Sequence, residues 1–131
     1  MTPPKLILCA DHSAEARYLL AVIFESINDY ELITFRSGQE LLFYLGHNMP
    51  GQICGVILDK DMPMMDGVET LLEIRKRPSY KITPAIIYST NENLGGRRMP
   101  LNLHGWFFQK PNNHTEARLF IEKITELFSC P

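Results

Sequence analysis

The chain has 131 residues, of which 45% are hydrophobic and 21% charged, and its formal net charge is −2. This length and balance predict one globular domain that can bury a core of its own. A slightly negative chain has no general attraction for nucleic acid or for an anionic membrane, because both bind basic surfaces. We therefore expect neither as a partner.

Neither the N-terminus nor the cysteines indicate export from the cell. Residues 1–5 are not followed by an apolar signal region, and no apolar run is long enough to cross a bilayer. The three cysteines are widely spaced and form no metal-binding motif, so we predict neither a zinc site nor a disulfide framework. A cytoplasmic protein is the expectation that follows.

The first part of the chain predicts two strands, each followed by a helix. Residues 5–10 form the first apolar run, and residues 13–28 carry apolar side chains at the spacing of one buried helix face. Residues 31–35 predict the second strand. Ser37 and Glu40 then fit a capping box, in which two side chains satisfy each other's free amides. A short helix should begin there.

The second part of the chain continues the alternation. Residues 53–58 predict the third strand, closed by Asp59, and Asp66 can cap the helix that follows. Residues 85–88 and 106–108 predict the fourth and fifth strands. Asn113 with Glu116 can cap a last helix, whose apolar side chains form one continuous stripe.

The alternation of strands and helices predicts an α/β fold with a parallel sheet covered on both faces. Five strands in this length suit a flavodoxin-like, doubly wound sheet with the order 2-1-3-4-5. Gly95, Gly96 and Pro100 oppose a regular fourth helix, which we expect to be short or irregular. No linker or repeat is visible, so we expect residues 1–131 to be a single domain with no output domain.

Polar side chains stand at the ends of the predicted strands, where ligands bind in open parallel sheets. A carboxylate there can attack a phosphoryl group and hold it as an acyl phosphate, with cations and donors around the transferred oxygens. Mg²⁺ prefers oxygen ligands, such as carboxylates and backbone carbonyls. The candidates are Asp11 and His12 after the first strand, Asp59, Lys60 and Asp61 after the third, Ser89 and Thr90 after the fourth, and Lys110 after the fifth.

Four short segments resemble the receiver domain of response regulators. Residues 56–67, VILDKDMPMMDG, resemble the signature around the phosphoacceptor aspartate, and residues 108–111, FQKP, resemble the closing Lys-Pro. Residues 87–90, IYST, resemble the Ser/Thr of the fourth strand. Residues 6–12, LILCADH, with Arg17 after them, resemble the opening strand and its acidic pair. Together these segments extend over nearly the whole chain.

The resemblance implies a role for each residue that matches. Asp59 would accept a phosphoryl group from a histidine kinase or a histidine phosphotransfer protein. Asp11, Asp59 and the backbone carbonyl at Asp61 would hold Mg²⁺. Ser89 and Lys110 would contact the acyl phosphate. Phe107 occupies the position of the family's switch aromatic, and the face of the fourth helix, fifth strand and fifth helix would then bind a downstream protein.

One departure from the family concerns the metal. His12 stands where we expect the second of two adjacent acids, and imidazole is a poor ligand for Mg²⁺. Metal binding is therefore expected to be weaker than usual, or to depend on Asp11 alone. A pseudo-receiver, which keeps the fold and binds proteins without phosphorylation, is one alternative that this departure favours.

A second alternative is an aspartate-nucleophile phosphatase, because Asp59-Lys60-Asp61 resembles the DxD motif of haloacid-dehalogenase enzymes. In that reading Asp61 would be the general acid and base. The later acidic pair of those enzymes is missing after Lys110, which counts against it. We expect no metabolic enzyme, only phosphorylation from a donor and autodephosphorylation. A transcription factor is disfavoured, because no helix-turn-helix segment follows the last helix.

Overall fold

The structure, a computed structural model, describes residues 5–27, 29–47, 52–90, 99 and 103–128. Within these residues five parallel strands form one sheet in the order β2-β1-β3-β4-β5. This is the predicted flavodoxin-like order. The strands are β1 (Lys5–Ala10), β2 (Tyr30–Phe35), β3 (Ile53–Asp59), β4 (Ala85–Ser89) and β5 (Gly105–Gln109).

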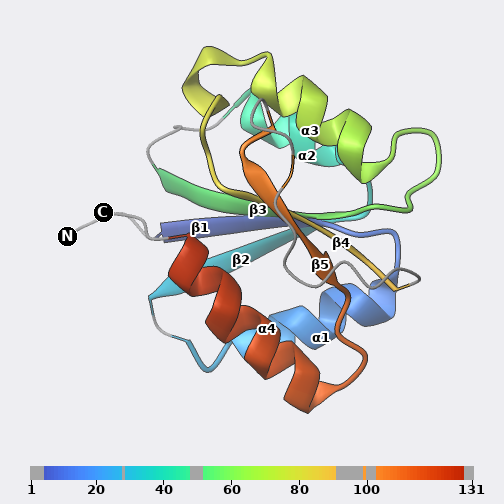
Figure 1. Cartoon of the computed structure of the whole chain (residues 1–131), viewed down its shortest axis with the longest axis vertical. Coiled ribbons are helices and arrows are strands. Elements are labelled where there is room, and N and C mark those ends of the chain that lie inside the picture. The colour runs from blue at the N-terminus through green and yellow to red at the C-terminus, as the bar shows by residue number, and fades with distance from the viewer. Residues whose placement is uncertain (1–4, 28, 48–51, 91–98, 100–102, 129–131) are drawn as a thin grey trace.

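Helices cover the sheet on both faces, as Figure 1 shows. The helices α1 and α4 lie on one face, and α2 and α3 lie on the other. Each strand between two helical layers alternates its side chains between the two faces, so both layers gain an apolar core. The helices are α1 (Ala14–Phe24), α2 (Gly38–Leu45), α3 (Gly67–Arg75) and α4 (His114–Leu127), with a 3-10 turn at Pro78–Tyr80.

Strands β1 and β3 lie at the centre of this arrangement. Every residue of β3 is buried, and in β1 only Lys5 is not. In β1 the side chains of Ile7 and Cys9 belong to the cluster under α1 and α4, whereas Leu8 and Ala10 belong to the cluster under α2 and α3. The central strands are thus fixed on both faces, which holds their carboxyl ends in place.

The predicted helix starts are confirmed, although the glutamates after Ser37 and Asn113 each accept from the amide of the residue before the cap. The side chains of Ser37, Asp66 and Asn113 each accept a hydrogen bond from the amide three residues later. Asp66 forms a complete capping box with Glu69. The Glu40 carboxylate, however, accepts from the amide of Arg36 and not from that of Ser37. The predicted reciprocal box at Ser37 is therefore wrong in its second half.

Two glycines allow close approaches that position the sheet. A Cβ on Gly55 in β3 would lie 2.5 Å from the ring of Phe128, which follows α4. A Cβ on Gly67, at the start of α3, would lie 2.5 Å from the backbone oxygen of Asp59. A side chain at either position would collide with its neighbour, so both glycines are needed for packing.

Arg75, in the last turn of α3, donates hydrogen bonds to three backbone carbonyls. Its guanidinium donates to the carbonyl oxygens of Leu103 at 2.7 Å, Tyr80 at 2.8 Å and His104 at 2.9 Å. Desolvation lowers the pKa of Arg75 to about 10. The contacts join α3 to the residues just before β5. Of the predicted fourth-helix segment, residues 93–98 and 100–102 lie outside the described residues, while Met99 and Leu103 are buried.

The cysteines differ from one another. Cys9 is a free thiol in the core, and burial together with the negative charge of Asp11 raises its pKa to about 12. Cys54 is disulfide-bonded, so the prediction that the chain carries no disulfide is wrong for this residue. Spacing along the sequence does not reveal which thiols the fold brings together.

Candidate functional site

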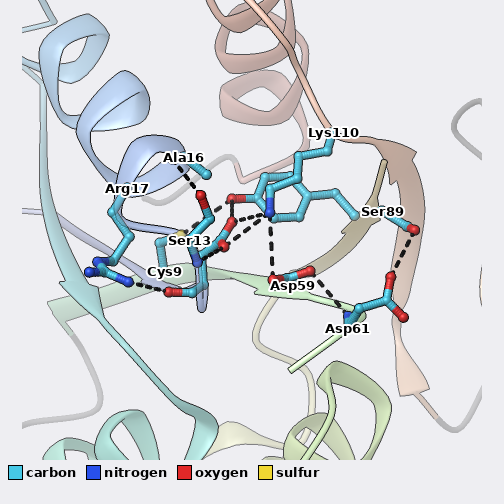
Figure 2. Close-up of polar contacts among 10 residues, drawn as sticks. Cys9, Ser13, Ala16, Arg17, Asp59, Asp61, Ser89 and Lys110 are labelled. Carbon is cyan, nitrogen blue, oxygen red and sulfur yellow. Dashed lines mark hydrogen bonds and ion pairs between the residues drawn. The ribbon is translucent and has the colours of Figure 1, made fainter. Parts of the chain in front are cut away.

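The polar residues predicted at the strand ends meet at the carboxyl edge of the sheet. Asp11 directly follows β1, Asp59 ends β3, Ser89 ends β4 and Lys110 directly follows β5. All four are buried, with exposed fractions of 0%, 5%, 1% and 8%. Residues up to 99 positions apart along the chain therefore form one polar cluster, in which Lys110 and Ser89 lie on either side of Asp59 (Figure 2).

Asp11 is held by three donors. Its Oδ1 accepts from the amide of Ser13 at 2.8 Å and from Nζ of Lys110 at 3.0 Å. Its Oδ2 lies 2.8 Å from the same Nζ and accepts the hydroxyl hydrogen of Tyr88 at 2.5 Å. Arg17 in α1 donates to the backbone oxygen of Asp11 at 2.6 Å. The carboxylate is thus fully desolvated, with its charge compensated mainly by Lys110.

Lys110 pairs with both carboxylates of the site. Besides its contacts with Asp11, its Nζ lies 3.5 Å from Oδ2 of Asp59. A cation between two acids offsets the cost of bringing them together in a dry place. The amide of Lys110 also donates to the carbonyl of Ser89 at 2.8 Å, which fixes the chain just beyond β5. Lys110 therefore stands where a charged group could contact an oxygen added to Asp59.

Asp59 is an unusually basic carboxylate. Burial and, after it, the negative charge of Asp11 raise the pKa of Asp59 to about 6, against the opposing effect of Lys110. Its Oδ1 accepts from the amide of Asp61 at 3.1 Å, which holds the loop beyond β3 close to the carboxylate. At neutral pH the group is ionised, yet it keeps more basicity than an exposed aspartate has. Both properties suit a nucleophile.

Asp61 and Ser89 form a contact of their own. The hydroxyl of Ser89 donates to Oδ2 of Asp61 at 3.2 Å, as Figure 2 shows. The side chain of Asp61 is exposed, and it points to Ser89, while its amide faces Asp59. The carboxylate of Asp61 thus accepts a hydrogen bond from the serine, and the predicted role of its backbone carbonyl as a metal ligand stays a prediction.

Phe107 lies in β5 on the face of α2 and α3. It is half-buried and packs against the apolar cluster of that face, whereas its neighbours Trp106 and Phe108 pack under α1 and α4. In the sheet it pairs with Ile87, two residues before Ser89. This placement is compatible with the predicted switch role, which stays a prediction.

The residues on either side of Asp11 supply no second carboxylate. Ala10 is fully buried in the apolar cluster under α2 and α3, and His12 is exposed. Within the described part of the chain, no group of three His, Cys, Asp or Glu side chains is placed to hold a metal. A divalent cation would thus have two carboxylates, those of Asp11 and Asp59, and otherwise backbone oxygen and water.

This donor set fits Mg²⁺ or Mn²⁺ better than a softer metal. It consists of oxygen atoms alone, and hard cations that keep several waters need only one or two carboxylates. Burial and, after it, the negative charge of Asp11 raise the pKa of Asp59, and a cation beside the two carboxylates would offset both effects. In this structure Lys110 supplies the positive charge between the two carboxylates.

Tyr88 is the member of the site that the sequence prediction missed. It lies in an apolar strand and has no exposed surface, so the sequence suggests only a core residue. Burial raises its pKa well above the ordinary value, and the hydroxyl remains a donor. The available signal was chemical, because a buried phenol beside a polar strand end needs an acceptor.

The chain is similar to known response regulators over most of its length. A sequence model described as the response regulator receiver domain matches residues 7–119. Response regulator Rcp1 of Synechocystis is 34% identical over 97 residues, which are 70% of this chain and 65% of that protein. Chemotaxis protein CheV2 of Helicobacter pylori is 30% identical over 120 residues, 91% of this chain and 38% of that protein. The chain thus spans less than two thirds of either relative.

Solved structures support the same fold. The Mn²⁺-bound form of response regulator Rcp1 aligns with a TM-score of 0.75 at 24% identity, covering 95% of this chain and 94% of that one. Chemotaxis protein CheY4 of Vibrio cholerae aligns with a TM-score of 0.70 at 22% identity, covering 93% and 99%. Among the described helices, none is long and apolar enough for a membrane crossing.

Proposed function

The chain belongs to the response regulator receiver family, and from this premise we propose that Asp59 is its phosphoacceptor in two-component signalling. The observation that carries the proposal is the contact of one buried lysine, Lys110, with both Asp11 and Asp59. A carboxylate nucleophile, a second carboxylate and a cation at the same sheet edge are the parts that phosphoryl transfer needs.

In the proposed reaction an oxygen of the Asp59 carboxylate attacks the phosphorus of a phosphohistidine or of a small acyl phosphate. The new O–P bond forms as the bond from phosphorus to the donor nitrogen or oxygen breaks, which leaves an acyl phosphate on Asp59. Mg²⁺, when bound, would neutralise charge on the transferred oxygens. Asp11 would hold it, together with Asp59 and the backbone oxygen of Asp61.

Lys110 and Ser89 are the proposed partners of the acyl phosphate. Lys110 already lies 3.5 Å from the Asp59 carboxylate, so a short movement of its flexible side chain would reach a phosphoryl oxygen. The Ser89 hydroxyl would have to leave Asp61, its present acceptor, to donate to that oxygen. Phe107, on the strand beside β4, would follow this movement.

The family receives its phosphoryl groups from histidine kinases or phosphotransfer proteins, and we propose the same class of donor here. A groove of about 490 Å³ between the start of α1 and the loop after β5 reaches Lys110 and supports an approach from that side. For the downstream protein we propose the predicted face of the fourth helix, fifth strand and fifth helix. Its described part consists of β5 and α4, the predicted fifth helix, where a second groove of about 460 Å³ contains Phe108, Leu119 and Phe120. A cytoplasmic location, a single domain and the lack of metabolic enzyme activity stay predictions.

The test is incubation of the full chain with acetyl phosphate and Mg²⁺, followed by intact mass. We expect one added phosphoryl group in the wild type and none in Asp59→Asn or after chelation of the metal. If the wild-type mass stays unchanged with both Mg²⁺ and Mn²⁺, the phosphoacceptor role is wrong. The non-phosphorylated binding module would then be the better description.

A further inference from the structure

Tyr88 is a polar residue that the proposed reaction does not use, although it lies inside the site. It is among the largest side chains that are completely buried. Its hydroxyl donates to Oδ2 of Asp11 at 2.5 Å and lies 3.8 Å from Sγ of Cys9, a weak partner by comparison. The strong hydrogen bond of this phenol therefore goes to the carboxylate.

The ring of Tyr88 is fixed by its surroundings. The ring of Phe120 in α4 packs against it with the centroids 5.6 Å apart. Nζ of Lys110 lies 5.1 Å from its centroid, within the range of a cation–π contact. The same side chain thus contacts both members of the Asp11–Lys110 ion pair, through its hydroxyl and through its ring. Packing of the ring therefore restricts its position in addition to the hydrogen bond with the carboxylate.

The hydrogen bonds of Asp11 leave little room for another ligand. An ionised carboxylate offers about four lone-pair positions. Four contacts fill them here, two from Lys110, one from the amide of Ser13 and one from Tyr88. Because Asp11 also has no exposed surface, a metal ion can take an oxygen of Asp11 only if one of these donors leaves.

Lys110 is the donor that can leave. The Ser13 amide belongs to the backbone and the Tyr88 ring is packed, whereas Lys110 has a long flexible stem and a charge that a metal ion repels. After its departure the Asp11 carboxylate would still be held at Oδ1 by Ser13 and at Oδ2 by Tyr88. Each oxygen would keep one fixed donor and present one free lone pair.

We propose that Tyr88 is a positioning residue for the divalent cation, whose hydroxyl holds the Asp11 carboxylate in the orientation that binds metal. The inference builds on the proposed function, because it takes Asp11 as a ligand. Hydrogen-bond partners of metal ligands commonly contribute about 10- to 100-fold to metal affinity. With no second acid beside Asp11, the orientation of this one carboxylate carries more of the affinity.

The experiment compares wild type with Tyr88→Phe, which keeps the ring and removes only the hydroxyl. Mn²⁺ is titrated into the full chain, and the free ion is measured by electron paramagnetic resonance. We expect Mn²⁺ to bind Tyr88→Phe about tenfold more weakly. In phosphorylation by acetyl phosphate, the half-saturating Mg²⁺ concentration should rise by a similar factor, whereas the rate at saturating Mg²⁺ should stay near that of wild type.

Tyr80→Phe is the matched control, because the Tyr80 hydroxyl is buried and has no hydrogen-bond partner within the described residues. Its Mn²⁺ affinity should equal that of wild type. Equal or tighter Mn²⁺ binding by Tyr88→Phe overturns the inference, as does a wild type that binds no Mn²⁺. A lower maximal rate with unchanged Mn²⁺ affinity would indicate a merely structural role and also overturns it. A wild type that binds Mn²⁺ without being phosphorylated defeats the proposed function, while the Mn²⁺ comparison still decides the role of Tyr88.

Discussion

Two desolvated cations lie at opposite ends of the sheet and have different kinds of partner. Lys110, at the carboxyl ends of the strands, contacts the charged oxygens of Asp11 and Asp59. Arg75, near the amino ends of β4 and β5, contacts three neutral backbone carbonyls. In the proposed function the partners of Lys110 would bind a metal ion or a phosphoryl group instead, so its contacts would be exchangeable. Those of Arg75 have no competing ligand, so its contacts serve the fold.

The strongest test of this contrast removes a partner of Lys110. Asp11→Ala should weaken Mn²⁺ binding by more than about 100-fold, because loss of a ligand costs more than loss of a partner to that ligand. Electron paramagnetic resonance of free Mn²⁺ measures it. Glu122→Ala is the control, since it removes one exposed carboxylate of α4 outside the site, and its Mn²⁺ affinity should match that of wild type. Equal losses in the two variants would contradict the assigned ligands.

The second test removes the other cation. Arg75→Met keeps the apolar stem but leaves three carbonyls without their donor, and we expect the free energy of unfolding to fall by about 2 kcal/mol. Urea unfolding followed by circular dichroism measures it. Lys76→Met is the neighbouring control, because its ion pair with Glu73 is exposed and is worth at most about 1 kcal/mol. Below the unfolding transition Arg75→Met should still be phosphorylated; a stable variant that cannot be phosphorylated would give Arg75 a role in the site.

The smallest expected effect concerns the charge of Asp59. Its pKa is raised from 3.8 to about 6, so the folded state binds this proton more tightly than the unfolded state does. Protonation of Asp59 therefore stabilises the folded state at pH values below the unfolded pKa, and this stabilisation is lost as the pH rises through about 6. In metal-free buffer at pH 8, Asp59→Asn should therefore be more stable than wild type by roughly 1 kcal/mol, allowing for solvent screening.

Thermal unfolding over a series of pH values checks this sign. The advantage of Asp59→Asn should shrink as pH falls from 7 toward 4, where the wild-type carboxyl becomes neutral. A wild type that is more stable than the variant at pH 8 would mean that Lys110 more than compensates the charge of Asp59. The site would then resemble the Arg75 cluster, with contacts optimised for stability.

The sequence predicts the strands well because both faces of the sheet are covered. Their apolar runs locate the strands, and the polar residues that follow them locate the candidate site, so Asp11, Asp59 and Lys110 meet as expected. Strand ends differ from the predicted ones by about a residue; β5 begins at Gly105 and ends at Gln109. Ladder hydrogen bonds extend past the apolar positions that mark a strand in sequence.

The contacts of Tyr88 and Arg75 were not predicted, for a shared physical reason. Each is an amphipathic side chain whose polar end finds a partner far along the chain, 77 residues away for Tyr88 and up to 29 for Arg75. Periodicity assigns such a residue to a face but cannot identify that partner. For the segment with Gly95, Gly96 and Pro100, the prediction of an irregular helix lies outside the described residues.

The close approach of Phe128 to Gly55 has a consequence for protein engineering. The phenyl ring occupies the space over the middle of β3 that a side chain at position 55 would fill. Shortening the chain to remove Phe128 would leave a void under the strand that carries Asp59 at its end. A reporter or affinity tag should therefore be fused downstream of this ring, and a shortened version for crystallisation should retain it.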